Sequence, residues 1–359
     1  MIILHIFRSL NRKIAGADVI IPEHIKIQQT KETVGCVNIT NTKIPGIDNQ
    51  LDYTENFKLS SLPAPFNKPD IIIFHQVYYP KFLGIAKQAR RAGIPYVIVP
   101  HGSLTKEAQN IKRLKKILGN LVFFNKFIKG ARAIQYLSES EMERAYKKLP
   151  CFVSTNGIHM PSEQKSSFND DKTVLSFIGR YDYYIKGLDL LLDAVRKKAD
   201  ILRKNNCILN MYGPHTEYYI GYINEIKQKI SEYNISDIVT LNGPVIDEEK
   251  KAVLWNTDIF IQCSRTEAMP MGILEAMSYG IPVLITDTTT LGSIVGKYEA
   301  GYHCKTDSSS IAEAIEKAVL EKDKLPKLSE NAKKLIEENF LWESVSKDAV
   351  SRYKKIAEN

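Results

Sequence analysis

The fold class is decided by residues 259–286, which have the sequence IFIQCSRTEAMPMGILEAMSYGIPVLIT. Both ends of this stretch are short apolar runs of the length of a β-strand. The segment between them has Pro270 close to its first turn and ends with Gly280 and Pro282, which are common signals for the start and the end of a helix. A strand, a helix and a second strand in this order predict a βαβ unit with two parallel strands.

The same alternation of apolar runs and amphipathic segments extends outward along nearly the whole chain. Continuous runs rich in Ile and Val, joined by helices, are typical of parallel sheets that are covered on both faces. We therefore predict an α/β fold with two doubly wound, Rossmann-like domains whose ligands bind at the carboxyl ends of the strands. Strands are expected near residues 2–7, 36–40, 70–75, 96–100, 133–138 and 151–155, and again near 174–179, 208–212, 238–242, 258–263 and 282–286. Helices are expected over residues 80–92, 106–129, 187–204, 217–234 and 311–321.

The length of 359 residues exceeds the usual size of one hydrophobic core and favours two domains. A polar stretch at residues 161–171 is the expected junction between a first domain, 1–165, and a second domain, 166–340. The last segment, 341–359, is predicted to form a helix that returns to pack on the first domain. Its apolar face would consist of Trp342, Val345, Val350 and Tyr353.

The composition excludes several classes of protein. The apolar fraction of 44% and the charged fraction of 25% are ordinary for a globular protein. No apolar run reaches the roughly 20 residues that span a membrane, and the first residues, MIILHIF, lack the basic region and cleavage site of a signal peptide. The five cysteines form no Cys-x-x-Cys pair, so we expect reduced, buried thiols in a cytoplasmic protein. They are Cys36, Cys151, Cys207, Cys263 and Cys304.

The net charge of +8 is unevenly distributed. Residues 1–165 contain 24 Lys and Arg against 12 Asp and Glu, a balance of +12, and the remainder contains 25 against 29, a balance of −4. Much of the excess lies in the segment 106–132, where basic residues alternate with apolar side chains that include Phe123, Phe124 and Phe127. Two interpretations stay open: a helix that docks on an anionic membrane, or a core-facing helix with a solvated basic side. Nucleic acid explains the basic half less well, since no aromatic stacking motif accompanies it.

Two glutamates bracket the predicted start of the helix that follows residue 263. Residues 270–273 lie at this helix N-terminus, where free N–H groups and the helix dipole favour an anion. Glu267 precedes the terminus and Glu275 lies one to two turns inside the helix. Carboxylates are poor phosphate ligands but good acceptors for sugar and ribose hydroxyls on either side of a diphosphate. A capping glutamate beside an ordinary helix glutamate is the alternative.

A basic turn lies upstream at the end of another predicted strand. Gly179 and Arg180 end the strand near 174–179, and Lys186 and Gly187 open the helix that follows. Arg and Lys at such a turn can together neutralise a diphosphate, as Mg²⁺ does in metal-dependent enzymes. The alternative is a solvated basic turn. The chain contains no Asp-x-Asp sequence that would anchor a metal, so we expect neither a metal nor a cofactor.

The stretch from Glu267 to Val283, together with the basic turn, resembles the signature of retaining glycosyltransferases of family 4, which have the GT-B fold with a cleft between two Rossmann-like domains. The resemblance implies that Glu267 faces the transferred sugar and that Glu275 binds the ribose of the nucleotide. Ala268 departs from the pattern, since the family usually has glycine there, and its methyl group alters the loop beside the donor.

The resemblance extends to other positions of the second domain. It implies that Arg180 and Lys186, with the backbone of Met271 and Gly272, bind the donor diphosphate. It assigns the loop beside the donor sugar and the turns beside the base to Met269, Pro270, Gly213 and Val245, although ordinary βα turns explain Gly213 and Val245 equally well.

In the first domain the segment Ser9–Ala17 resembles the glycine-pair loop of the family, which closes over the donor phosphate. Ala15 replaces the first glycine, so that only Gly16 carries over. His101, which follows a predicted strand in the sequence PHGS, resembles the histidine that contacts the transferred sugar. His75, also at a strand end, is expected on the acceptor side. A structural histidine is the alternative for both.

The resemblance implies a retaining, metal-independent transfer of a hexose from a nucleotide-diphosphate sugar, with uridine as the expected base. The basic first domain favours a lipid-linked saccharide acceptor in the synthesis of bacterial capsule, lipopolysaccharide or another surface glycan, with reversible docking on an anionic membrane. A nucleotide-sugar epimerase of the same fold and a non-catalytic nucleotide-sugar-binding subunit are the alternatives. The sequence disfavours a dinucleotide dehydrogenase, because no Gly-x-Gly-x-x-Gly follows a predicted strand.

Overall fold

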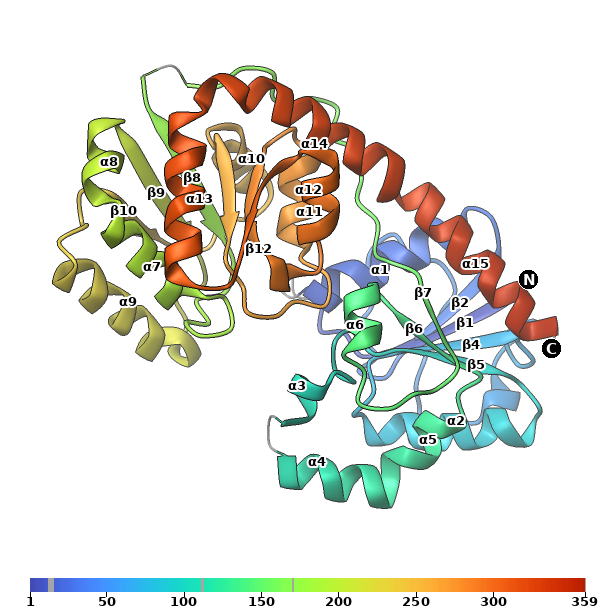
Figure 1. The fold of residues 1–359 in the computed structure, drawn as a ribbon. Helices are drawn as coiled ribbons and strands as arrows, with labels where there is room; N and C mark the ends of the chain where they lie inside the picture. Colours follow the sequence, from blue (N-terminus) through green and yellow to red (C-terminus); the bar gives the residue numbers. More distant parts are fainter. Residues whose placement is uncertain (12–15, 111–112, 170, 359) are drawn as a thin grey trace. The chain divides into compact units, whose positions relative to one another are not determined.

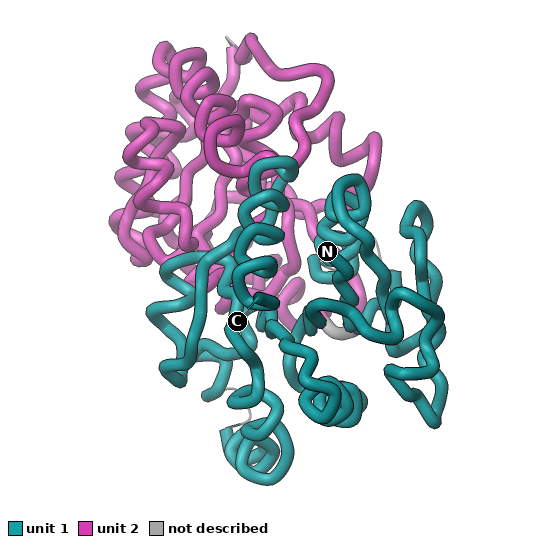
Figure 2. Tube along the Cα trace, turned by 90° about the vertical axis from the view of Figure 1, so that its right-hand side faces the viewer, with its two compact units in different colours: residues 1–157, 342–359 teal, residues 158–341 magenta. Residues whose placement is uncertain are grey.

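The computed structural model describes residues 1–11, 16–110, 113–169 and 171–358. All strand pairs among these residues are parallel. These residues form two compact units. Unit 1 comprises Met1–Gly157 and Trp342–Asn359, and unit 2 comprises Ile158–Leu341 (Figure 2). The junction expected from the sequence, between residues 165 and 166, lies eight residues after the change from unit 1 to unit 2.

The described part of unit 1 contains a seven-stranded sheet in the order β3-β2-β1-β4-β5-β6-β7. Its central strands are almost wholly buried, which explains their continuous apolar sequences. The strands are β1 (Ile2–Phe7), β2 (Thr33–Asn38), β3 (Gln50–Leu51), β4 (Ile71–His75), β5 (Tyr96–Val99), β6 (Ala133–Tyr136) and β7 (Cys151–Val153). The edge strand β3 was not predicted, because two residues carry no periodic signal.

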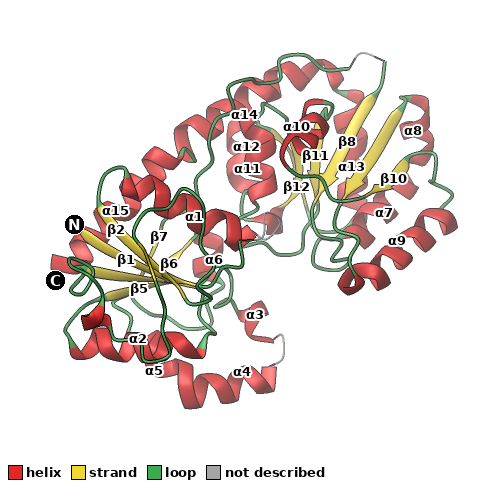
Figure 3. Ribbon diagram, turned by 180° about the vertical axis from the view of Figure 1, so that it is seen from behind, coloured by secondary structure: helices red, strands yellow, loops and turns green. Residues whose placement is uncertain are grey.

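Helices accompany this sheet (Figure 3). One face is packed with a core that joins the sheet to α2 and α5, including Phe74, Phe82 and Phe127. The helices of unit 1 are α1 (Gly16–Gln29), α2 (Pro80–Arg91), α3 (Lys106–Asn110), α4 (Arg113–Gly119), α5 (Asn125–Lys129), α6 (Glu139–Glu143) and α15 (Trp342–Glu358), with the short turn η1 (Leu59–Ser61) and the π-helical turn η2 (Asn120–Phe124).

Helix α15 belongs to unit 1 although it lies at the end of the chain (Figure 1). Its expected apolar face is buried. The Tyr353 hydroxyl donates a hydrogen bond to Gln135 Oε1 on β6, and Lys354 forms an ion pair with Glu32 at 2.6 Å. Trp342 leaves no room for a Cβ at Gly157, so a glycine is needed where the chain passes beneath the indole.

The sequence predicts one helix over residues 106–129, and this prediction is wrong. The segment consists of α3, α4, η2 and α5, and residues 111–112 lie outside the described part. Phe124 and Phe127 are buried in the core, as the core-facing interpretation predicts, whereas Phe123 is exposed. In the part of the chain that the structure describes, no helix is long and apolar enough to cross a membrane.

The described part of unit 2 contains a six-stranded sheet in the order β10-β9-β8-β11-β12-β13. The polar edge strand β13 was not predicted, since its sequence, GYHC, lacks an apolar run. The strands are β8 (Thr173–Ile178), β9 (Cys207–Tyr212), β10 (Val239–Asn242), β11 (Ile259–Gln262), β12 (Val283–Thr286) and β13 (Gly301–Cys304).

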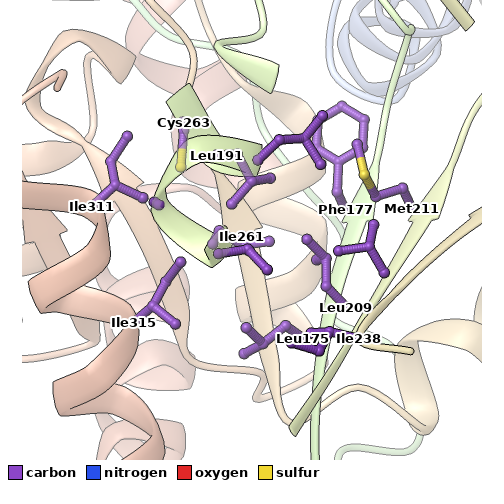
Figure 4. Close-up of a cluster of buried hydrophobic side chains, with 14 of the residues drawn as sticks. Leu175, Phe177, Leu191, Leu209, Met211, Ile238, Ile261, Cys263, Ile311 and Ile315 are labelled. Atoms are coloured by element: carbon purple, nitrogen blue, oxygen red, sulfur yellow. The ribbon is translucent and has the colours of Figure 1, made fainter. Parts of the chain in front are cut away.

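Both faces of this sheet are covered. The core on one face joins Leu175, Leu209 and Ile261 of the strands to α7, α9 and α13 (Figure 4). The core on the other face joins β11 and β12 to α10, α11, α12 and α14. The helices are α7 (Leu188–Lys197), α8 (Ala199–Lys204), α9 (Ile220–Glu232), α10 (Asp247–Trp255), α11 (Met271–Ser278), α12 (Gly292–Tyr298), α13 (Ser308–Leu320) and α14 (Leu325–Asn339), with the turns η3 (Glu217–Tyr219), η4 (Asp287–Thr289) and η5 (Lys322–Lys324).

The cysteines are free thiols, as expected, but not all of them are buried. Cys36, Cys207 and Cys263 lie in the cores, whereas Cys151 is exposed and Cys304 is half-buried. Cys151 and Cys304 are on the short edge strands β7 and β13, where one side of the sheet has no further neighbour.

Candidate functional site

The strand order of unit 2 changes direction between β8 and β11. From β8 the chain moves to β9 and β10 on one side of the sheet, and β11 and β12 lie on the other side. The loops after β8 and β11 therefore leave the sheet in opposite directions, which is the position where doubly wound sheets bind their ligands. These loops, residues 179–187 and 263–270, contain Arg180, Lys186 and Glu267.

The two loops touch at Gly187. This residue has φ +63°, and an added Cβ would overlap the carbonyl oxygen of Cys263 at the end of β11, so both the conformation and the space require glycine. The N–H of Arg265 donates to the carbonyl of Ile185 at 2.9 Å. Lys186, which lies between these two contacts, is therefore held against the loop that contains Glu267.

The Glu267 carboxylate is the centre of a polar cluster. Its Oε1 accepts hydrogen bonds from Lys186 Nζ, from Gln262 Nε2 at 2.9 Å and from Ser264 Oγ at 2.9 Å. The Lys186 and Glu267 side chains are 12% and 16% exposed, so the ion pair is largely shielded from water. Hydrogen bonds from several donors fix the orientation of the carboxylate.

Arg265 links the loop after β11 to α7. Its guanidinium pairs with both oxygens of Asp189 on α7, at 2.7 and 2.6 Å, and donates to the Tyr184 carbonyl at 2.7 Å. It also lies 4.0 Å from the centre of the Tyr184 ring. A bidentate pair with a planar fork gives orientation as well as energy, so the loop after β11 has little freedom to move relative to α7.

Helix α11 begins directly after this loop. Pro270 precedes its first residue, and its first turn contains no acidic side chain that would oppose a bound anion. An added Cβ at Gly272 would lie 3.3 Å from the Phe260 ring, so glycine allows the helix to start close to β11. The N–H groups of Met271 and Ile273 donate to the carbonyls of Met269 and Pro270, at 3.1 and 3.0 Å. A bound anion would compete with these two carbonyl oxygens for the N–H groups.

Glu275 lies on α11 and forms an ion pair with Lys250 of α10. Both side chains are 28% exposed, so the pair is accessible to a ligand. The pair therefore joins α10, the helix after β10, to α11, the helix after β11.

The remaining predicted residues of unit 2 lie at the same edge of the sheet. Arg180 is exposed, and Val245 is half-buried in the turn after β10. An added Cβ at Gly213 would overlap the Gly179 carbonyl, so the turns after β8 and β9 are in contact. The Tyr181 hydroxyl lies 2.8 Å from the carbonyls of Met211 and Asn242, which ties these turns to the end of β10, and burial raises the pKa of this hydroxyl.

His75, at the end of β4, lies where the strand order of unit 1 changes direction, between β1 and β4, and His101 lies in the loop after the neighbouring strand β5. His101 follows β5 with φ +48°, and Gly102 has φ +81°. The loop is held by the buried carboxylate of Glu141, which accepts from the N–H groups of Gly102 at 2.6 Å and Leu137 at 2.7 Å. Burial raises the pKa of Glu141, and these two hydrogen bonds oppose that rise.

His75 was expected to line the acceptor side, but the structure places it behind His101. It is 1% exposed, and its ring nitrogens face His5 at 2.9 Å and His101 at 3.3 Å. Gly16 is exposed at the start of α1. Ala15 and the rest of residues 12–15 in the expected glycine loop lie outside the described residues.

Comparisons with known proteins agree with this arrangement. Residues 161–335 match the model of the family "Glycosyl transferases group 1". The match spans nearly all of unit 2, including Arg180, Lys186, Glu267 and Glu275. Unit 2 is therefore the part of the chain that resembles this family.

Individual relatives are more distant. An uncharacterized glycosyltransferase of Methanocaldococcus jannaschii is 25% identical over 205 residues, which cover 55% of this chain and 50% of the relative. The Bacillus subtilis protein TuaC, assigned to teichuronic acid biosynthesis as a glycosyltransferase, is 24% identical over 279 residues, 76% of this chain and 67% of the relative. For the first curated relatives the chain spans half of their length or less.

The likeness to solved structures covers both units. The chain resembles Anabaena Alr3699/HepE, solved in complex with UDP, with a TM-score of 0.75, 17% identity and coverage of 99% of this chain and 100% of that chain. The predicted fold is thereby confirmed as GT-B, with a Rossmann-like sheet in each unit.

Several residues of unit 2 that position the Glu267 cluster were missed by sequence reasoning. Gln262 and Ser264 orient Glu267, and Lys250 pairs with Glu275. A signal existed for Gln262, which is a polar residue at the end of an otherwise apolar strand, IFIQ. No local signal marked Lys250, because its partner is 25 residues away on another helix.

Proposed function

We propose that the chain is a retaining, metal-independent glycosyltransferase that transfers a hexose from a nucleotide-diphosphate sugar, with uridine as the base, to a saccharide acceptor. The observation that carries this proposal is the cluster of Lys186, Glu267, Gln262 and Ser264. It lies where the loops after β8 and β11 meet, within the residues that match the glycosyl transferases group 1 family. It combines a cation suited to a diphosphate with an oriented carboxylate suited to a sugar ring.

The transfer breaks the bond between the anomeric carbon and the diphosphate oxygen, and the electron pair stays on the leaving diphosphate. Arg180, Lys186 and the positive end of α11 would stabilise that charge. The acceptor hydroxyl oxygen forms the new bond to the anomeric carbon and releases its proton to the departing phosphate. Glu267 would stabilise the positive charge that develops on the ring, as carboxylates do in glycoside cleavage.

Lys186 has a double role in this proposal. Before the donor binds, it neutralises Glu267. When the diphosphate enters, the ammonium is shared between the phosphate oxygens and the carboxylate, so Glu267 keeps its charge for the transferred sugar. Glu275, already paired with Lys250, still has acceptor capacity for the ribose hydroxyls.

The test compares two lysines that each pair with a glutamate in unit 2. Lys186→Ala is expected to abolish acceptor-dependent release of uridine diphosphate. Lys198→Ala, which removes the ion pair with Glu316 and lies outside the loops after β8 and β11, is expected to leave this release unchanged. Equal activity of the two variants would contradict the proposal. Conversion of the donor to its epimer without an acceptor would favour an epimerase, and donor binding without any turnover would favour a non-catalytic subunit.

We further propose that the acceptor is lipid-linked and that unit 1 docks on an anionic membrane, as in the synthesis of capsule, lipopolysaccharide or another surface glycan. The support is a set of exposed apolar side chains on α4 and η2 beside basic ones. Leu114 is 78% exposed and Leu121 is 71% exposed, and Leu118, Val122 and Phe123 are also exposed. Apolar side chains so placed beside Arg113 and Lys115 suit an interfacial helix.

Docking is measured by sedimentation with anionic vesicles at low and high salt. Leu118→Ser with Leu121→Ser and, separately, Arg113→Glu with Lys115→Glu should each abolish sedimentation, because both apolar insertion and charge contribute. Lys87→Glu with Arg91→Glu on α2 is the matched control and should sediment normally. If the wild-type protein stays in solution even at low salt, the acceptor is not reached by this surface.

A further inference from the structure

A chain of buried imidazoles runs inward from His101 in the described part of unit 1. His101 Nε2 lies 3.3 Å from His75 Nδ1, and His75 Nε2 lies 2.9 Å from His5 Nδ1. His5 Nε2 lies 2.9 Å from the Gln28 side-chain oxygen, and the Gln28 amide nitrogen lies 2.9 Å from His24 Nδ1. The chain joins the loop after β5 to β4, β1 and α1.

The chain is closed to water at its inner end and open at its outer end. His5, His24, His75 and Gln28 are buried, whereas His101 is partly exposed. The His24 ring is perpendicular to the Trp342 indole, with ring centres 5.4 Å apart. Burial lowers the pKa of His5 to about 3 and that of His24 to about 4, so these rings are neutral.

A neutral imidazole has one donor and one acceptor nitrogen. Because the Gln28 oxygen faces His5 Nε2, this nitrogen must carry the proton, and His5 Nδ1 is then an acceptor. His75 Nε2 must therefore donate to His5 Nδ1, which makes His75 Nδ1 an acceptor for His101 Nε2–H. Each ring must adopt the same Nε2–H tautomer as the ring next to it on the side of Gln28. The amide of Gln28 therefore determines the tautomers of His5, His75 and His101.

We propose that Gln28, acting through His5 and His75, holds His101 as the Nε2–H tautomer, so that its Nδ1 is left as an acceptor for a hydroxyl group of a sugar ligand. This role rests on the proposed function. The three buried residues are positioning residues, since they reach the sugar only through His101. If the amide of Gln28 were reversed, the whole chain would reverse, and His101 would offer a donor in place of an acceptor.

The tautomers are measured directly by nitrogen-detected NMR of the full chain labelled with ¹⁵N in its imidazoles, at neutral pH and without ligand. We expect the wild-type protein to show protonated Nε2 and unprotonated Nδ1 at His5, His75 and His101. A protonated Nδ1 at His101, or an average of both tautomers, overturns the proposal. This measurement does not depend on any enzymatic activity, so a failure of the proposed function would be recognised separately.

A variant pair then tests the consequence. Gln28→Leu removes the group that selects the tautomer, and His101 should show both tautomers. The kcat/KM for transfer should fall about tenfold, the scale of one lost hydrogen bond, while binding of uridine diphosphate is unchanged. Gln28→Glu keeps an oxygen that accepts from His5 Nε2–H and should restore the wild-type tautomer.

Gln29→Leu is the matched control, because Gln29 lies on the same helix but bonds to the Val34 and Asp48 carbonyls. It should lower stability without changing the His101 signals. If Gln28→Leu behaves like Gln29→Leu in both the spectrum and the kinetics, the imidazole chain is only structural. If Gln28→Leu does not fold, the spectrum of the wild-type protein decides alone.

Discussion

At the scale of single residues, unit 2 contains two carboxylates in different surroundings. Glu267 is largely buried and receives hydrogen bonds from Lys186, Gln262 and Ser264. Glu275 is more accessible and is paired with Lys250. A carboxylate held rigidly beside the position of charge development suits the transition state, whereas an accessible one suits ground-state binding.

The first prediction separates the two glutamates by kinetics. Glu275→Ala should mainly raise the KM for the donor, since ribose hydroxyls are held alike in the ground and transition states. Glu267→Ala should mainly lower kcat. Steady-state kinetics with varied donor concentration measure both effects, and the reverse pattern would exchange the two proposed roles.

The second prediction concerns the donor diphosphate. Arg180→Ala should weaken binding of uridine diphosphate by about 1.5–3 kcal/mol, the range for hydrogen bonds to charged groups. Arg180 is exposed on a turn, so the stability of unit 2 should not change. Calorimetric titration measures the affinity and thermal unfolding measures the stability. A variant with wild-type affinity would remove Arg180 from the phosphate site.

At the scale of elements, the site depends on close contacts between loops that leave neighbouring strands. Gly187 brings the start of α7 against the end of β11, and Arg265 joins the same loop to Asp189. Gly213 allows the turn after β9 to touch the turn after β8. These contacts explain why glycines recur at the strand ends of this domain: a side chain there would push the loops apart.

The third prediction tests the contact at Gly187. Gly187→Ala adds a methyl group that overlaps the Cys263 carbonyl, at a backbone conformation with φ +63°. We expect a loss of about 1–3 kcal/mol in the free energy of unfolding of unit 2, together with weaker donor binding. Gly221→Ala on α9 is the control, because nothing lies within 4 Å of its added Cβ, and it should be neutral or slightly stabilising. Equal stability of the two variants would show that the loops can separate without cost.

At the scale of the whole molecule, the two units have similar sheets but different polar interiors. Unit 1 buries neutral imidazoles in its core, whereas unit 2 gathers ion pairs at the carboxyl edge of its sheet. The buried imidazoles make the stability of unit 1 depend on pH, and the cations at the edge of unit 2 are proposed to take the place of a metal.

The fourth prediction concerns pH. His5 and His24 are neutral in the folded protein down to about pH 4 but gain a proton below about pH 6.5 when unfolded, so their contribution to stability is lost as the pH falls through this range. Each should cost up to about 1.4 kcal/mol per pH unit. Denaturant unfolding at pH 7.5 and 5.5 measures the loss. His24→Gln should reduce the dependence, whereas His215→Gln, at an exposed site, should not.

The fifth prediction concerns metals. If Arg180, Lys186 and the start of α11 neutralise the diphosphate, transfer should continue in excess chelator at an unchanged rate. Complete loss of transfer with EDTA and its recovery with Mn²⁺ would refute the proposed division of labour between cations and metal.

The strands, helices and turns of this protein were largely predictable because their signals are local. Apolar runs marked the buried parallel strands, and Gly280 and Pro282 marked the end of α11. The errors have the same cause. The strands β3 and β13 are short or polar, and the basic segment after residue 106 has a helical composition that does not reveal where the core interrupts it.

Local patterns in the amino-acid sequence were enough to establish the parallel α/β class, the order of the elements and the residue types at the strand ends. Which of these residues are in contact depends on the tertiary structure. Lys186 and Glu267 are 81 residues apart, and His5 and His75 are 70 apart. Their contacts follow from the strand order and register, which bring distant strand ends to one edge of a sheet. Periodicity cannot specify this pairing, since any two buried parallel strands have nearly the same pattern.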